Sequence, residues 1–140
     1  MNAYFDTSAI VPLLVAEAGT ARARRLWDEA DRVLSARLVY PKGRASLAQA
    51  RRVARLTAAQ LRAAVRAFDD HCEQLDLVEL DETLARQAGD LAEAHGLRGY
   101  DAVHLAAADR VNAADLVFVA GDRTLLRAAT SIGLTIATTS

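Results

Sequence analysis

The sequence predicts a single α/β domain of three layers, in which helices cover both faces of a mostly parallel sheet of about five strands. Two observations predict it. Short apolar runs alternate along the chain with longer segments of helical periodicity, which is typical of parallel strands joined by helices. The chain also has 140 residues, 52% of them hydrophobic, enough for one domain with a substantial core. We therefore expect residues 1–140 to form one domain.

The first half of the chain provides two strands and four helices. Residues 3–5 are an apolar run bounded by polar residues, which suits a strand buried on both faces. A helix over residues 8–17 follows, with Pro12 in or near its first turn, where proline is tolerated. We expect a second helix over 20–31, a strand over 33–36 and a long helix from Leu38. Thr57 and Gln60 fit a capping box and open the next helix, which runs to about residue 72.

The second half repeats the alternation of strand and helix. We expect a strand over 75–80 and a helix that Asp81 caps and Gly96 ends. An alanine-rich helix follows over residues 100–111. The last elements are a strand over 116–120, a helix over 123–130 and a strand over 134–137.

The composition restricts the compartment and the partners. Cys72 is the only cysteine, so we expect no disulfide within the chain and a reducing compartment. The first residues lack the pattern of a signal peptide, and the apolar run 9–16 is far shorter than the roughly 20 residues that span a bilayer. We expect a cytoplasmic protein that does not enter a membrane. Residues 32–68 contain basic residues and no acid, so this third can bind a polyanion, although solvated helix faces explain the charge equally well.

Three aspartates are predicted to meet at one edge of the sheet. Asp6 follows the first strand directly, and Asp122 follows the strand over 116–120 after one glycine. Asp101 lies in the first turn of a predicted helix. Each has a simpler explanation, because an aspartate at a helix start caps free N–H groups or offsets the helix dipole. Ligands nevertheless bind at the carboxyl ends of parallel strands, so convergence of the three acids there predicts a site.

Carboxylates that gather at one edge repel one another unless a cation lies among them. A set of oxygen ligands suits Mg²⁺ or Mn²⁺, and these ions commonly serve phosphoryl-transfer chemistry. The spacing of His71, Cys72 and His95 does not indicate a zinc site.

Three stretches of the chain resemble the acidic motifs of PIN-domain ribonucleases, and in particular the VapC-type toxins of bacterial toxin–antitoxin pairs. They are residues 4–9 (YFDTSA), 97–106 (LRGYDAVHLA) and 121–123 (GDR), in the order and spacing of that family. The resemblance implies a metal-dependent endoribonuclease with Asp6, Asp101 and Asp122 as catalytic metal ligands. Supporting or phosphate-contacting roles then fall to the side chains of Thr7, Ser8, His104 and Thr124.

One position departs from the family pattern. The family places another acid, normally glutamate, where this chain has Lys42, the only lysine in the sequence. We hypothesise that Lys42 results from a recent Glu→Lys change, selected or engineered to detoxify the protein. An ammonium group there could pair with Asp101 or Asp122 and take the place of the cation, and we expect it to weaken metal binding and impair cleavage. A lysine turned towards solvent would leave three acids and residual metal binding.

The resemblance also implies partners. We expect an RNA substrate, a cognate VapB-type antitoxin that covers the acidic edge, and a homodimer. Candidate contacts to the RNA backbone are Arg44, Arg51, Arg52 and Arg55. The alternative is a PIN-fold protein that binds RNA or an antitoxin without cutting.

Overall fold

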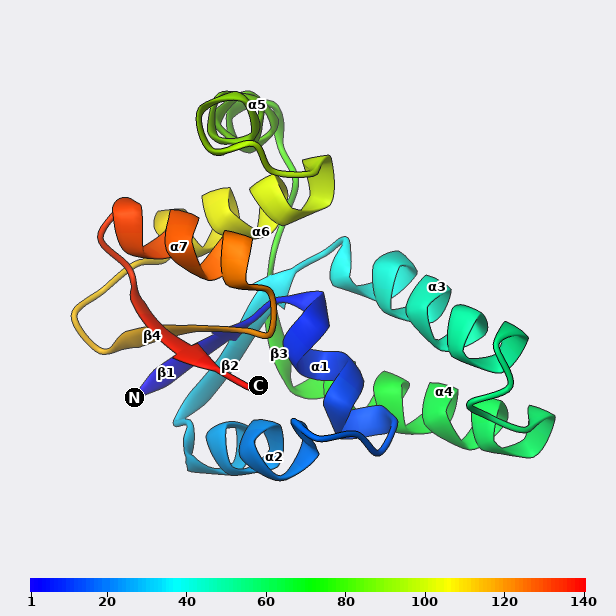
Figure 1. The fold of residues 1–140 in the computed structure, drawn as a ribbon. Coiled ribbons are helices and arrows are strands. Elements are labelled where there is room, and N and C mark those ends of the chain that lie inside the picture. Colours follow the sequence, from blue (N-terminus) through cyan, green and yellow to red (C-terminus); the bar gives the residue numbers. More distant parts are fainter.

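A five-stranded parallel sheet forms the centre of the computed structural model, which describes residues 1–140 (Figure 1). The strands lie in the order β3-β2-β1-β4-β5, and every neighbouring pair is parallel. Their bounds are β1 (Asn2–Phe5), β2 (Arg32–Ala36), β3 (Leu75–Val78), β4 (Leu116–Ala120) and β5 (Thr135–Thr138). The predicted sheet is confirmed, and β1 is its central strand.

Seven helices cover the two faces of this sheet. One face carries α1 (Thr7–Leu14), α2 (Thr20–Glu29), α3 (Val39–Arg52) and α4 (Ala58–Gln74). The other carries α5 (Glu82–His95), α6 (Gly99–Arg110) and α7 (Arg123–Ser131). Each face has its own apolar core, and the alternation of β1 sends Tyr4 into one and Phe5 into the other. The three-layer α/β/α architecture is therefore confirmed.

Most helix ends follow the predicted signals. Thr57 and Gln60 form a capping box, Asp81 accepts from the backbone of Leu84, and Gly96 ends α5 with φ 65°. The exception is α1, which begins at Thr7 and ends at Leu14. Pro12 therefore lies in the second turn and not the first, where its missing N–H leaves the Ser8 carbonyl without the usual helical partner.

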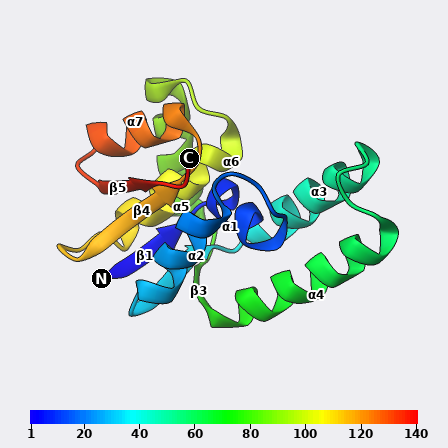
Figure 2. The ribbon, with the colours of Figure 1, turned by 60° about the horizontal axis from the view of Figure 1, so that its bottom comes forward.

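Helices α3 and α4 form an arm that extends from the body of the molecule (Figures 1 and 2). The two helices approach closely at Gly43, where an added Cβ would lie 2.3 Å from Cζ of the buried Phe68. Phe68 in turn stacks on Tyr40 of α3, with ring centroids 5.3 Å apart. This packing therefore requires glycine at position 43.

Gly43→Ala is expected to destabilise the protein by about 1–3 kcal/mol, because the methyl group forces Phe68 out of its place. Gly89→Ala is the matched control, since a Cβ at Gly89 of α5 meets nothing within 4 Å. Alanine there is expected to stabilise by about 0.5–1 kcal/mol. Urea unfolding of the two variants should therefore give shifts of opposite sign. A neutral Gly43→Ala would contradict the close packing of the arm.

None of the seven helices combines the length and apolar character that crossing a membrane requires.

Candidate active site

Three aspartates meet at the carboxyl edge of the sheet, as predicted. Asp6 follows β1 and caps α1, and Asp122 follows the neighbouring β4 and caps α7. Asp101 lies in the first turn of α6. An aspartate can therefore cap a helix with one carboxylate oxygen and still present the other oxygen to the site. In Asp122, Oδ1 accepts from Leu125 N at 3.0 Å, and Oδ2 has no hydrogen bond.

Asp6 is the most buried of the three, at 2% exposure. Its Oδ1 accepts from the Ser8 hydroxyl at 2.6 Å and from Ala9 N at 3.2 Å. Its Oδ2 has no hydrogen-bond partner, yet no fully buried side-chain oxygen in the protein lacks one. Oδ2 therefore reaches solvent and is free to bind a ligand.

The three carboxylates lie close enough to repel one another. Burial raises the pKa of Asp6 from 3.8 to about 7, against the lowering effect of the Ser8 hydroxyl. The negative charges of Asp101 and Asp122 raise the pKa further, whereas the Ala9 N–H lowers it. A cation at this edge would relieve both the repulsion and the cost of burying the charge.

Ser8 joins the two central strands at the site. Its Oγ donates to Asp6 and accepts from Gly121 N at 2.8 Å. Since Gly121 precedes Asp122, this one hydroxyl fixes the ends of β1 and β4 relative to each other. Ser8 thus holds two of the aspartates in place.

His104 and Thr7 lie beneath the acids and bond to each other. The buried His104 shares hydrogen bonds with the Tyr4 hydroxyl at 2.8 Å through Nδ1 and with Thr7 Oγ1 at 3.0 Å through Nε2. Burial lowers the pKa of His104 to about 3, so the ring is neutral. Both ring nitrogens are occupied, and the Thr7 hydroxyl points into this core network.

Arg98 is the functional side chain that the sequence reasoning missed. Its Nε donates to Asp101 Oδ2 at 2.9 Å, and its Nη2 lies 3.8 Å from Asp122 Oδ2. The spacing of Arg98 and Asp101 could have indicated their contact, because residues three apart at the start of a helix are neighbours. Arg98, Asp101 and Asp122 line a cavity of about 170 Å³ together with Thr124.

Lys42 forms no ion pair, so the expected pairing with Asp101 or Asp122 is wrong. The half-buried lysine reaches from α3 to α6, and its Nζ lies 4.3 Å from the centroid of the Tyr100 ring. Arg98, and not Lys42, is the cation that contacts the acids. The physical reason is that the ring provides Lys42 with a cation–π contact on the neighbouring helix.

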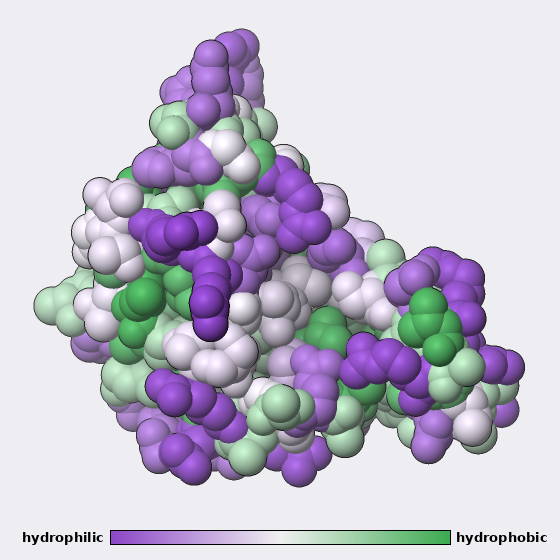
Figure 3. Space-filling view, viewed as in Figure 1, coloured by the Kyte–Doolittle hydropathy of each residue, from purple (hydrophilic) through white to green (hydrophobic).

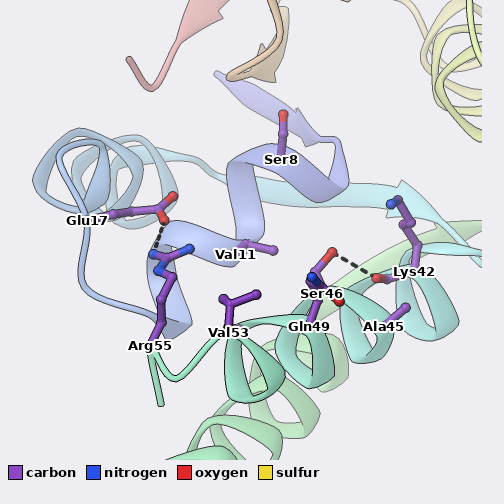
Figure 4. Close-up of a pocket in the computed structure, with 10 residues that line it drawn as sticks. Ser8, Val11, Glu17, Lys42, Ala45, Ser46, Gln49, Val53 and Arg55 are labelled. Atoms are coloured by element: carbon purple, nitrogen blue, oxygen red, sulfur yellow. Dashed lines mark hydrogen bonds and ion pairs between the residues drawn. The ribbon is translucent and has the colours of Figure 1, made fainter.

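A groove of about 430 Å³ begins beside the acids and runs between α1 and α3. Figure 4 shows Ser8 and Lys42 towards one end of it and the ion pair of Glu17 with Arg55, 3.0 Å long, at the other. In the space-filling view the surface is hollowed between the arm and the body (Figure 3).

The four arginines predicted to contact RNA do not all face this groove. Arg55 lines it. Arg44 donates to the Tyr40 hydroxyl and Arg52 to the Gln49 side chain, while Arg51 is exposed without a partner. The structure therefore brings only Arg55 into a surface continuous with Ser8 and Lys42.

The chemistry of the acids fits a divalent cation, since all donors are carboxylate oxygens and their mutual repulsion favours a positive charge. No three acid, histidine or cysteine side chains form a ready cage in their present conformations. Arg98 contacts Asp101 and also approaches Asp122.

The comparisons with known proteins agree with this architecture. Residues 3–130 match the PIN domain family, and the chain belongs to that family. It is also 46% identical to ribonuclease VapC45 of Mycobacterium tuberculosis over 134 residues, which is 96% of this chain and 93% of that protein. This identity places it among the VapC ribonucleases, the toxins of VapBC toxin–antitoxin systems, whose family activity is metal-dependent cleavage of RNA. The family and activity predicted from the sequence are confirmed.

Solved structures share the fold at low sequence identity. The crystal structure of VapC20 from M. tuberculosis, a toxin that cleaves the sarcin–ricin loop, superposes with a TM-score of 0.70 at 19% identity, covering 95% of this chain and 96% of that chain. A toxin–antitoxin complex from Klebsiella pneumoniae gives 0.67 at 14% identity, covering 99% and 98%.

Proposed function

We propose that the chain cuts RNA with Mg²⁺ or Mn²⁺ bound by Asp6, Asp101 and Asp122, and that Lys42 makes this cutting slow. The convergence of three carboxylates at the end of the central strands, with Oδ2 of the buried Asp6 left free, carries the proposal. Mg²⁺ and Mn²⁺ are favoured because every donor is an oxygen.

The residues of the chain prepare this edge. Ser8 and the Ala9 N–H hold Asp6 through Oδ1, which leaves Oδ2 for the cation. Without a cation, Asp6 keeps its proton up to about pH 7, so metal binding releases that proton and strengthens as the pH rises. When bound, the cation offsets the charge of the scissile phosphate and activates a water molecule.

The groove between α1 and α3 provides a path for the RNA backbone away from the cut. Lys42 and Arg55 line it, and a phosphate is a stronger partner for Arg55 than its half-exposed pair with Glu17. Arg44, Arg51 and Arg52 lie on α3 outside the groove and add to the positive potential of the arm. We expect RNA binding to weaken as salt concentration rises.

Lys42 impairs the site in two ways. The position where the family normally has a carboxylate lacks one. Lys42 also places a positive charge on the ring of Tyr100, the residue before Asp101. Both effects lower the affinity for a divalent cation. A chain with weak metal binding and intact RNA binding is the alternative function, that of a non-catalytic partner of RNA or an antitoxin. The guanidinium of Arg98 beside Asp101 and Asp122 favours it.

An antitoxin is the protein partner that we propose. The Klebsiella pneumoniae structure of this fold is a toxin–antitoxin complex, and α1 leaves Val11 and Leu14 only partly buried, with Val11 lining the groove. A VapB-type antitoxin that seats apolar residues there would cover the acidic edge. We also propose a homodimer, which size-exclusion chromatography with light scattering tests directly.

The function is tested by incubating the purified chain with a panel of RNAs. We expect slow cleavage with Mg²⁺ or Mn²⁺ that stops when EDTA removes the metal. Asp122→Asn, purified in parallel, controls for contaminating nucleases and should be inactive. Cleavage that persists in EDTA, or that Asp122→Asn retains, would overturn the proposed site. Metal-independent RNA binding without any cleavage would favour the non-catalytic alternative.

A further inference from the structure

Arg98 is the only basic residue that approaches two different carboxylates. Each of the other arginine ion pairs in the protein joins one arginine to one acid. Arg98 instead donates to Asp101 at 2.9 Å and lies 3.8 Å from Asp122. These two acids are two of the three proposed metal ligands.

The position of Arg98 at the N-terminal end of α6 makes this bridging possible. Asp101 is one turn further along the same helix, and its side chain is only 13% exposed, whereas that of Arg98 is 64% exposed. The arginine therefore approaches the acids from the solvent side. That is also the side from which an ion would enter.

A guanidinium that already pairs with these carboxylates repels a divalent cation that approaches the same oxygens. Arg98 already binds Oδ2 of Asp101 and faces Oδ2 of Asp122. We propose that Arg98 is the built-in counter-ion of the acidic edge, which a divalent cation must displace in order to bind.

The displaced side chain has a second place to lie. Its Cζ is already 5.4 Å from the centroid of the Tyr100 ring, and Tyr100 is 37% exposed. Rotation away from the acids keeps the guanidinium against this ring, where the cation–π contact offsets part of the lost ion pair. Arg98 then faces outward beside the metal, in position to contact an RNA phosphate.

This inference rests on the proposed metal site, and metal binding itself tests it without any assay of cleavage. Mn²⁺ is titrated into the full chain at pH 8, and free Mn²⁺ is followed by electron paramagnetic resonance. Arg98→Gln removes the competing charge and is expected to lower the apparent Kd about tenfold, because the ion no longer has to break a charge-assisted hydrogen bond to Asp101. Arg98→Met, which keeps the aliphatic part of the side chain, should shift the Kd in the same direction.

Arg110→Gln is the matched control. It breaks the ion pair with Asp81 at the other end of α6, so it removes one arginine charge and one Arg–Asp pair without touching the acidic edge. Its Kd for Mn²⁺ should equal that of the unmodified chain. Circular dichroism confirms that each variant is folded.

The outcomes separate the two proposals. If the unmodified chain binds Mn²⁺ and neither Arg98 variant binds it more tightly, Arg98 does not compete with the metal and only this inference fails. If no variant binds Mn²⁺, the metal site fails and the inference with it. Tighter binding by Arg98→Gln and Arg98→Met, with Arg110→Gln unchanged, supports both.

Discussion

Lys42→Glu is expected to raise metal-dependent RNA cleavage about 100-fold, since changes around a metal site typically alter affinity or activity by 10–100-fold and this one reverses a charge. The variant restores a carboxylate near the acidic edge and removes an ammonium group. The variant loses the contact of Lys42 with the Tyr100 ring, whose centroid lies 4.3 Å from Nζ. Such a cation–π contact stabilises a protein by only about 0.5–1 kcal/mol at an exposed site. Folding should therefore survive the change.

Lys42→Gln separates the two causes of the gain. Glutamine removes the positive charge without adding a carboxylate, so it should recover about a tenth of the gain made by glutamate. Cleavage rates at several Mn²⁺ concentrations measure both variants beside the unmodified chain. Equal rates in all three would mean that Asp6, Asp101 and Asp122 suffice and that Lys42 is harmless.

The hypothesis that Lys42 is a recent change is independent of its effect on activity. Sequencing the native locus tests it, and a lysine codon there would contradict it. In that case the slow cleavage would be a property of the natural protein.

The positions of the three aspartates could be predicted from the sequence, but the contacts that Lys42 and Arg98 make could not. Asp6 and Asp122 could be placed because a residue after a parallel strand must lie at the carboxyl edge, whatever the packing around it. Their role as helix caps follows from the same local chain geometry, which is why both predictions agree with the structure.

The partners of Lys42 and Arg98 depend on tertiary packing and rotamers. Lys42 meets Tyr100 only because α3 and α6, far apart in sequence, both begin at this edge of the sheet. The same holds for His104, whose bonds to Tyr4 and Thr7 join α6 to β1 and α1. No local pattern indicates such pairs. The bounds of α1 were also missed, because the helix begins at Thr7, one residue before its predicted start, and ends at Leu14, three residues before its predicted end.

Asp6→Asn, made in the Lys42→Glu chain, is expected to reduce cleavage by more than about 100-fold, because it removes a metal ligand and not merely a supporting contact. Asparagine can still accept the hydrogen bonds of Ser8 and Ala9 and still caps α1. The variant should therefore stay folded and lose the negative charge alone. Activity that survives the change would remove Asp6 from the proposed site.

The same substitution, made in the unmodified chain without metal, should make the protein more stable at pH 8. The pKa of Asp6 is about 7 in the folded chain, against the ordinary value of 3.8 that it takes when the chain unfolds. Between these values the folded state holds a proton that the unfolded state has lost. Stability therefore falls as the pH rises from about 4 to 7, by an amount on the order of 2–4 kcal/mol. Asp6→Asn avoids this loss, and its advantage in urea unfolding should vanish near pH 4.

Asp81→Asn is the control of opposite sign. Asp81 also caps a helix, but its ion pair with Arg110 lowers its pKa to about 2, so its charge stabilises the fold above pH 4 and asparagine there should destabilise it. A helix cap selected for stability behaves like Asp81. If Asp6 instead weakens the metal-free fold at pH 8, its ionised carboxylate is explained by the cation that it binds and not by the helix that it caps. Equal effects of the two substitutions at pH 8 would refute that explanation.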